Sequence, residues 1–168
     1  MHRRSFIRLG AGSAVVLARA GAGAARWSPG LRQGHLSAPA RAVARAVAEA
    51  VLAGTLPLPG AAREAALAAH LQRFDATVGG LPAAVRAELS DLFALLSSAP
   101  GRRLITGLSH DWAEASTAQV TEALQAMRRS SMALRQQVYH ALRDLTNAAW
   151  FAEPSTWAAL GYPGPRPL

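Results

Sequence analysis

Cysteine is absent from this chain of 168 residues. Its absence excludes disulfide bridges, thiolate nucleophiles, cysteine-ligated zinc, iron–sulfur clusters and covalently attached c-type haem. The sequence also lacks the patterns of common cofactor sites, because no G-x-G-x-x-G follows a strand-like segment and neither G-x-x-x-x-G-K-[ST] nor H-E-x-x-H occurs. Any redox role of this chain is therefore expected to be indirect.

Lysine is absent as well, so all 18 basic residues are arginines. A net charge of +8 is typical of proteins that bind nucleic acid through phosphate contacts. Four of the arginines lie in the first 19 residues, and removal of those four would lower the charge from +8 to +4. The uniform use of arginine, with abundant alanine and glycine, indicates a compositional bias. We therefore expect no nucleic-acid partner.

The chain opens with a basic segment, His2-Arg3-Arg4-Ser5-Phe6-Ile7-Arg8. This segment resembles the twin-arginine export signal, in which a Ser or Thr precedes two arginines, any residue, Phe and Leu. Arg3, Arg4 and Phe6 match that pattern, whereas His2 and Ile7 depart from it. The resemblance implies an exported protein that passes the twin-arginine translocase already folded.

A modestly apolar stretch at 9–18 follows, too short to span a bilayer. Small residues then offer cleavage after Ala22, Ala24 or Ala25. We expect a signal peptide over residues 1–25 and a linker over 26–38. The alternative is a basic amphipathic helix or an uncleaved anchor.

Beyond the linker the sequence predicts a single all-α domain over 39–153. Half of the residues are apolar, which is enough for one core. Apolar residues recur at helical spacing between Gly and Pro boundaries. The predicted helices begin at Pro39, at Ala61, at Pro82, at the capping box Ser116–Gln119, and at about Ser131. We expect a bundle of five or six helices, with residues 102–108 left unassigned.

The last residues, 154–168, differ in composition from the bundle. Ser155 after Pro154 is expected to cap a short helix that Gly161 ends. Tyr162-Pro163-Gly164-Pro165 predicts an extended tail with few hydrogen-bond donors. Such a tail needs a surface, either on its own bundle or in the groove of a partner.

The terminal motif W-x-x-x-G-Y-P-G-P, at 157–165, resembles the gluconate 2-dehydrogenase subunit 3-like family. The resemblance extends loosely over residues 40–165 and is best over 139–165. Residues at similar spacing are Trp112, Arg128-Arg129-Ser130, Tyr139, Leu142 and Trp150. Two features depart from the family: the chain has no cysteine, and Phe151 stands where Tyr is more usual.

The resemblance implies a non-catalytic accessory subunit. Its companion would be a catalytic FAD-dependent dehydrogenase of the glucose–methanol–choline type, which the small subunit escorts through the translocon to the periplasm. Membrane association would then be peripheral and only through the complex. The chain would carry no catalytic residue, cofactor or metal of its own. The expected contact residues are exposed aromatics and the tail: Trp150, Phe151, Trp157, Tyr162 and Pro163.

The histidines support a different hypothesis. His110 with Asp111, His70 and His140 are possible metal ligands or general bases. None of them has the i, i+4 spacing of a helical metal pair, and His110-Asp111 before Trp112 favours a cap or turn. The alternative function is a stand-alone periplasmic helical protein that binds a small ligand or a metal.

Overall fold

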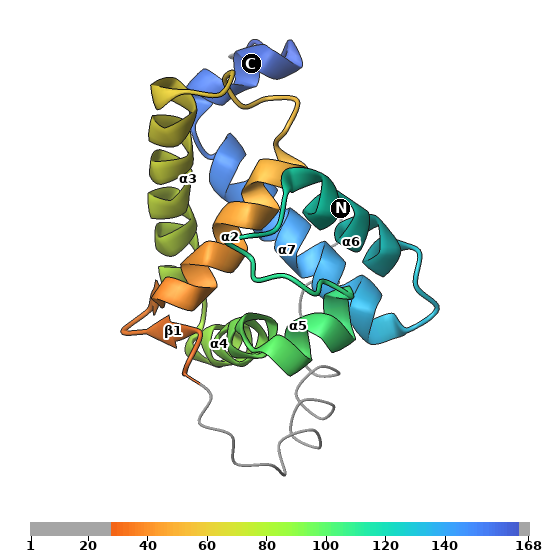
Figure 1. The fold of residues 1–168 in the computed structure, drawn as a ribbon. Helices are drawn as coiled ribbons and strands as arrows, with labels where there is room; N and C mark the ends of the chain where they lie inside the picture. The colour runs from red at the N-terminus through yellow and green to blue at the C-terminus, as the bar shows by residue number, and fades with distance from the viewer. Residues whose placement is uncertain (1–27, 165–168) are drawn as a thin grey trace.

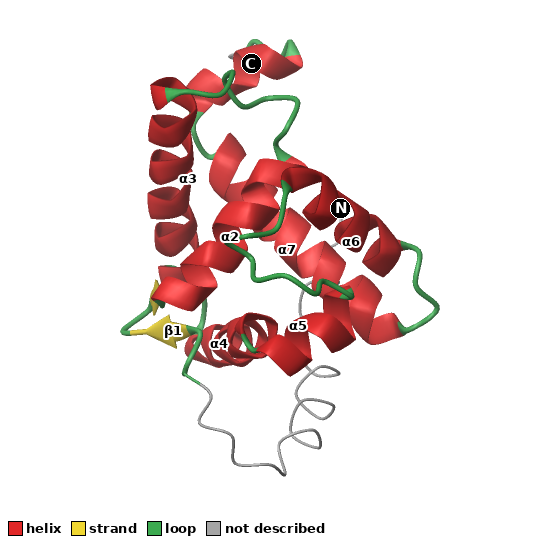
Figure 2. Cartoon of the chain, viewed as in Figure 1, coloured by secondary structure: helices red, strands yellow, loops and turns green. Residues whose placement is uncertain are grey.

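The computed structural model describes residues 28–164, which form six α-helices, a short 3-10 helix and a two-stranded hairpin (Figures 1 and 2). In chain order these are β1 (Leu31–Arg32), β2 (His35–Leu36), α2 (Ala38–Val51), α3 (Ala61–Gly79), α4 (Ala83–Ser97), α5 (Ala99–Thr106), α6 (Thr117–Arg128), α7 (Ala133–Phe151) and η1 (Pro154–Leu160). The predicted all-α class is confirmed. The expected export signal lies outside the described residues.

Helix α2 runs through the centre of the bundle and packs against α3, α4, α6 and α7 (Figure 1). Its buried residues are all alanine or valine: Ala40, Val43, Ala44, Ala46, Val47 and Ala48. Small side chains allow several neighbouring helices to approach one helix closely. The alanine bias of the sequence therefore has a packing role at this position.

Side chains cap the first turns of two helices, and the predicted capping box is one of them. The Ser37 side chain accepts a hydrogen bond from the backbone N–H of Ala40, with Pro39 in the first turn of α2. Ser116 and Gln119 form a complete capping box at the start of α6. Each cap satisfies backbone donors that the first turn of a helix leaves unpaired.

Helix α5 occupies part of the stretch that the sequence left unassigned. Ser98 is the C-cap of α4 and also the N-cap of α5, and Pro100 lies in the first turn of α5. The Ser98 Oγ accepts from the Gly101 N–H at 3.1 Å. A Cβ at Gly101 would lie 2.2 Å from the Leu95 carbonyl oxygen, so this tight corner requires glycine.

The segment expected as a linker, 26–38, contains the hairpin β1–β2 and contributes to the core. Its turn places Gln33 and Gly34 at positive φ, and Leu36 is buried. The Gly30 N–H donates to the Ser90 carbonyl oxygen at 3.2 Å, which attaches the segment to α4. Residues 30–37 therefore belong to the folded domain.

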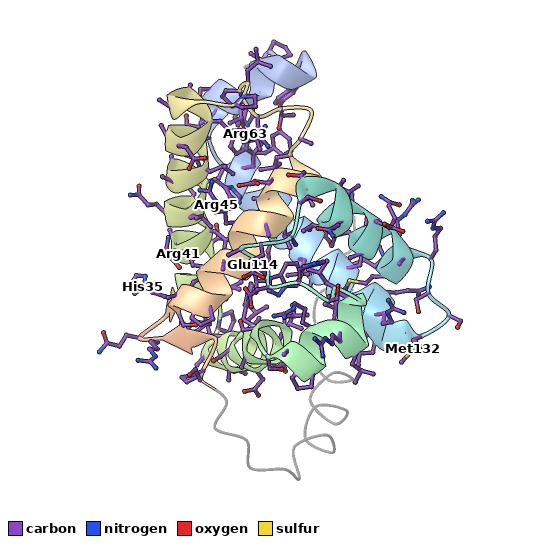
Figure 3. The ribbon with its side chains drawn as sticks, viewed as in Figure 1. His35, Arg41, Arg45, Arg63, Glu114 and Met132 are labelled. Carbon is purple, nitrogen blue, oxygen red and sulfur yellow. The ribbon has the colours of Figure 1, made fainter. Side chains whose placement is uncertain are left out.

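Asp75 of α3 holds the other end of the hairpin. Its Oδ1 accepts from the Leu36 N–H at 2.8 Å, and its Oδ2 pairs with the Arg41 guanidinium. Figure 3 shows Arg41 on the side of α2 that faces α3. A buried carboxylate is stable in such a place because both of its oxygens have partners.

None of the described helices is both long enough and apolar enough to cross a membrane.

The attachment of the hairpin can be tested with two glycine substitutions. A Cβ at Gly30 would lie 2.4 Å from the Ser90 carbonyl oxygen and 2.5 Å from the Phe93 Cβ. We expect Gly30→Ala to lower the free energy of unfolding by about 2 kcal/mol, because backbone must shift to admit the methyl group. Urea denaturation followed by circular dichroism measures the change.

Gly54→Ala is the matched control, since a Cβ there would meet nothing within 4 Å. We expect it to leave the stability unchanged or to raise it by about 0.5 kcal/mol. Equal stability of the two variants would contradict the packing of residues 30–37 against α4.

Candidate docking site at the C-terminal end

Residues 154–164 form a small folded unit at the end of α7, here called the C-terminal knob (Figure 1). It begins with η1, which is a 3-10 helix capped by Glu153, whose side chain accepts from the Ser155 N–H at 3.4 Å. The expected cap was Ser155 itself. Gly161 ends the helix in the left-handed conformation, with φ of 67°, as predicted.

Trp157 organises the knob. Its indole Nε1–H donates to the Phe151 carbonyl oxygen at 2.8 Å, and its own carbonyl oxygen accepts from the Tyr162 N–H at 3.2 Å. The rings of Trp157 and Tyr162 are 5.5 Å apart between centroids and tilted by 55°. Gly164 passes close to the same indole. Residues 162–164 therefore fold back on Trp157.

The five expected contact residues differ in exposure. Tyr162 is 50% exposed and Pro163 is exposed, whereas Phe151 and Trp157 are half-buried. These four lie together at one end of the molecule, in the knob and the last turn of α7. The fifth, Trp150, is only 5% exposed, so the expectation that it is an exposed contact residue is wrong.

Trp150 instead attaches the knob to the buried core. It packs in a small buried cluster with Ala48, Leu52 and Leu67, from α2, the loop after it and α3. The carbonyl oxygen of Trp150 accepts from the Thr156 hydroxyl at 3.2 Å. One residue therefore connects the core to the knob through its side chain and its backbone.

Two residues of α3 complete the surroundings of Trp150. The Arg73 guanidinium lies over the indole ring, 5.9 Å from its centroid, and its Nε–H donates to the Ala149 carbonyl oxygen at 3.1 Å. The His70 ring lies 5.9 Å from the Trp150 ring on a tilted approach. The end of α7 is thus fixed against α3.

His70 is fully buried, and neither of its ring nitrogens has a hydrogen-bond partner among residues 28–164. Burial, and to a smaller extent the positive charge of Arg73, lowers the pKa of His70 to about 4. The imidazole is therefore neutral at neutral pH. His70 is one of the possible ligands in the sequence, but its place between Leu67 and Phe74 on the apolar stripe of α3 indicates burial.

The other candidates of the ligand-binding hypothesis do not come together. His110 and His140 are exposed, and Asp111 pairs with Arg102 at 3.0 Å while its carbonyl oxygen accepts from two backbone N–H groups of the next turn. Within the described part of the chain, no three His, Cys, Asp or Glu side chains are close enough to hold a metal ion. The turn interpretation of Asp111 is therefore confirmed.

Two open hollows are present on the bundle. One, of about 150 Å³, lies between α2 and the segment before α6, and Arg45 and Glu49 line it. These two side chains pair with each other at 3.1 Å. The second, of about 260 Å³, lies between α2, α6 and α7, and its lining includes Tyr139 and Arg143. Neither hollow reaches the C-terminal knob.

Comparisons with protein-family models, with curated proteins and with solved structures each give no match for this chain.

The burial of His70 predicts a pH dependence of stability. In the unfolded chain His70 binds a proton near its ordinary pKa of 6.5, but in the folded chain only near 4. The free energy of unfolding is therefore expected to fall as the pH decreases below about 6.5, with a contribution from His70 of about 3 kcal/mol by pH 4. Urea denaturation across this pH range measures the loss.

His70→Phe should remove that contribution, because no imidazole remains to take up a proton. His140→Gln is the control, since it deletes an exposed imidazole and should keep the wild-type pH profile. Parallel profiles for His70→Phe and the wild type would show that burial of His70 is not linked to stability.

Proposed function

We propose that this chain is a non-catalytic accessory subunit and export escort for a periplasmic FAD-dependent dehydrogenase of the glucose–methanol–choline type. The observation that supports the proposal is the C-terminal knob, in which Trp157 holds Tyr162 by its ring and backbone, while Tyr162 and Pro163 remain exposed. The same residues belong to the motif that resembles the gluconate 2-dehydrogenase subunit 3-like family. In this proposal the redox chemistry belongs to the companion.

The knob has the physical properties of a docking element. Aromatic side chains are enriched among the residues that contribute most to binding at protein interfaces. Tyr162 presents half of its surface to solvent while its ring and backbone are held by Trp157. Because the conformation is already formed, little conformational entropy is lost when a partner binds.

The opening segment supplies the second half of the proposed function. Arg3, Arg4 and Phe6 lie outside the described residues and resemble the twin-arginine signal in sequence. That route accepts folded proteins, so a flavoprotein can bind its FAD and this chain before transit. The flavoprotein then reaches the periplasm without a signal of its own.

The escort function predicts that a variant can lose export of the flavoprotein while this chain itself is still exported. The full chain is expressed together with a signal-free flavoprotein of this type, such as one encoded beside it, and FAD is measured in periplasmic and cytoplasmic fractions. We expect Tyr162→Ala to lower the periplasmic flavoprotein by tenfold or more, because truncation of a central aromatic contact typically costs about 2 kcal/mol. The variant chain itself should still be exported.

His35→Ala is the matched control, because His35 carries an exposed ring in the β1–β2 hairpin, at the end of the bundle away from the knob (Figure 3). It should leave flavoprotein export unchanged. Circular dichroism checks that both variants keep the helical fold. Normal flavoprotein export with Tyr162→Ala would contradict docking through the knob.

A further inference from the structure

A second exposed apolar surface lies far from the C-terminal knob. Leu104 on α5 is 69% exposed, and Met132, immediately before α7, is 51% exposed. The two belong to one corner of the bundle, because the Arg135 side chain donates from Nε to the Ile105 carbonyl oxygen at 2.7 Å. Figure 3 shows Met132 at this corner, and Figure 1 shows α5 beside the start of α7.

Arginines lie next to these two apolar side chains along the chain, because Arg103 precedes Leu104, and Arg128, Arg129 and Arg135 lie within four residues of Met132. Arg103, Arg128 and Arg129 are exposed, and Arg135 is half-buried. No Asp or Glu occurs in residues 92–110 or 123–143. We call this surface the arginine–apolar corner and define it by Arg103, Leu104, Arg128, Arg129, Met132 and Arg135.

The remaining arginine of α5 does not contribute to the corner. Arg102 is buried, and its guanidinium pairs with Asp111 at 3.0 Å. For Arg103, Arg128 and Arg129 no ion pair occurs among the described residues. The charge of these three side chains is therefore not neutralised locally.

We propose that the arginine–apolar corner binds the surface of an anionic phospholipid bilayer directly. An anionic headgroup layer complements the arginines, and the acyl boundary beneath it accepts Leu104 and Met132. A bilayer would contact both the arginines and the apolar side chains of the corner. A polyanion such as nucleic acid would contact only the arginines and would leave Leu104 and Met132 exposed. Direct binding of this kind differs from the expectation that membrane association occurs only through a complex.

The position of the corner is compatible with simultaneous partner binding. Met132 precedes α7 and the C-terminal knob follows it, so the 19 residues of α7 separate the two surfaces by about 28 Å. A chain bound to a membrane through this corner keeps Tyr162 and Pro163 accessible. Binding of this corner to a bilayer requires no particular partner protein.

The absence of cysteine provides a direct test. Single variants Leu104→Cys, Met132→Cys and Leu58→Cys are made in the full chain and labelled with an environment-sensitive, thiol-reactive fluorophore. Leu58, which is 87% exposed in the loop between α2 and α3, is the matched control outside the corner. Emission is recorded with vesicles of equimolar phosphatidylcholine and phosphatidylglycerol, with phosphatidylcholine vesicles, and with duplex DNA.

We expect a blue shift at positions 104 and 132 with the anionic vesicles, and none with the neutral vesicles or at position 58. Because the label reports its own surroundings, attachment through the basic opening segment would not produce this pattern. Equal shifts at all three positions, or no shift, would overturn the proposal. So would a response to DNA alone, or emission already blue-shifted without vesicles, which would mean that another part of the chain covers the corner.

Charge variants give an independent measurement. Arg128→Gln with Arg129→Gln should weaken binding to the anionic vesicles by about 25-fold, because each arginine near such a surface contributes about a fivefold factor. Arg32→Gln with Arg63→Gln removes the same charge elsewhere and should have a much smaller effect. Equal weakening by both pairs would indicate attraction by net charge only and would contradict a specific corner.

Discussion

The packing of Trp150 against α3 is the contact on which the rest of the C-terminal structure depends. The indole lies beside His70 and below the Arg73 guanidinium, and it closes the small cluster around Leu67. A buried aromatic side chain of this size contributes a large share of local packing energy. The Trp150 carbonyl oxygen also accepts a hydrogen bond from the Thr156 hydroxyl. Trp150 therefore both packs the end of α7 against α3 and orients the C-terminal knob.

Most of the fold was predictable because helical periodicity and local caps agree in this sequence. Ser37 and the Ser116–Gln119 box mark helix starts through bonds to their own first turns, so no tertiary information is needed. Helix α5 was not predicted, because Pro100 and Gly101 end a helix in one context and begin one in another. The hairpin at 30–36 depends on distant partners, Ser90 and Asp75, that sequence spacing does not indicate.

The candidate site was only partly predictable, for a related physical reason. Trp150 and Trp157 are seven residues apart, and both have other aromatic residues nearby in the sequence. Sequence composition therefore predicts an interface role for both tryptophans alike. Tertiary packing distinguishes them, since one is buried against α3 and the other supports an exposed tyrosine. The arginine–apolar corner likewise combines α5 with the start of α7, and only their adjacency in space reveals it.

Docking through the C-terminal knob is the central claim, and amide hydrogen exchange tests it most directly. Exchange is measured for the chain alone and for the chain with an FAD-containing flavoprotein of the proposed type. The account predicts slower exchange at residues 155–162 in the mixture, because a partner would cover a segment in which Ser155, Gly161 and Tyr162 are exposed in the free chain. Stable complex formation with unchanged exchange at these residues, and with protection confined to another surface, would contradict it.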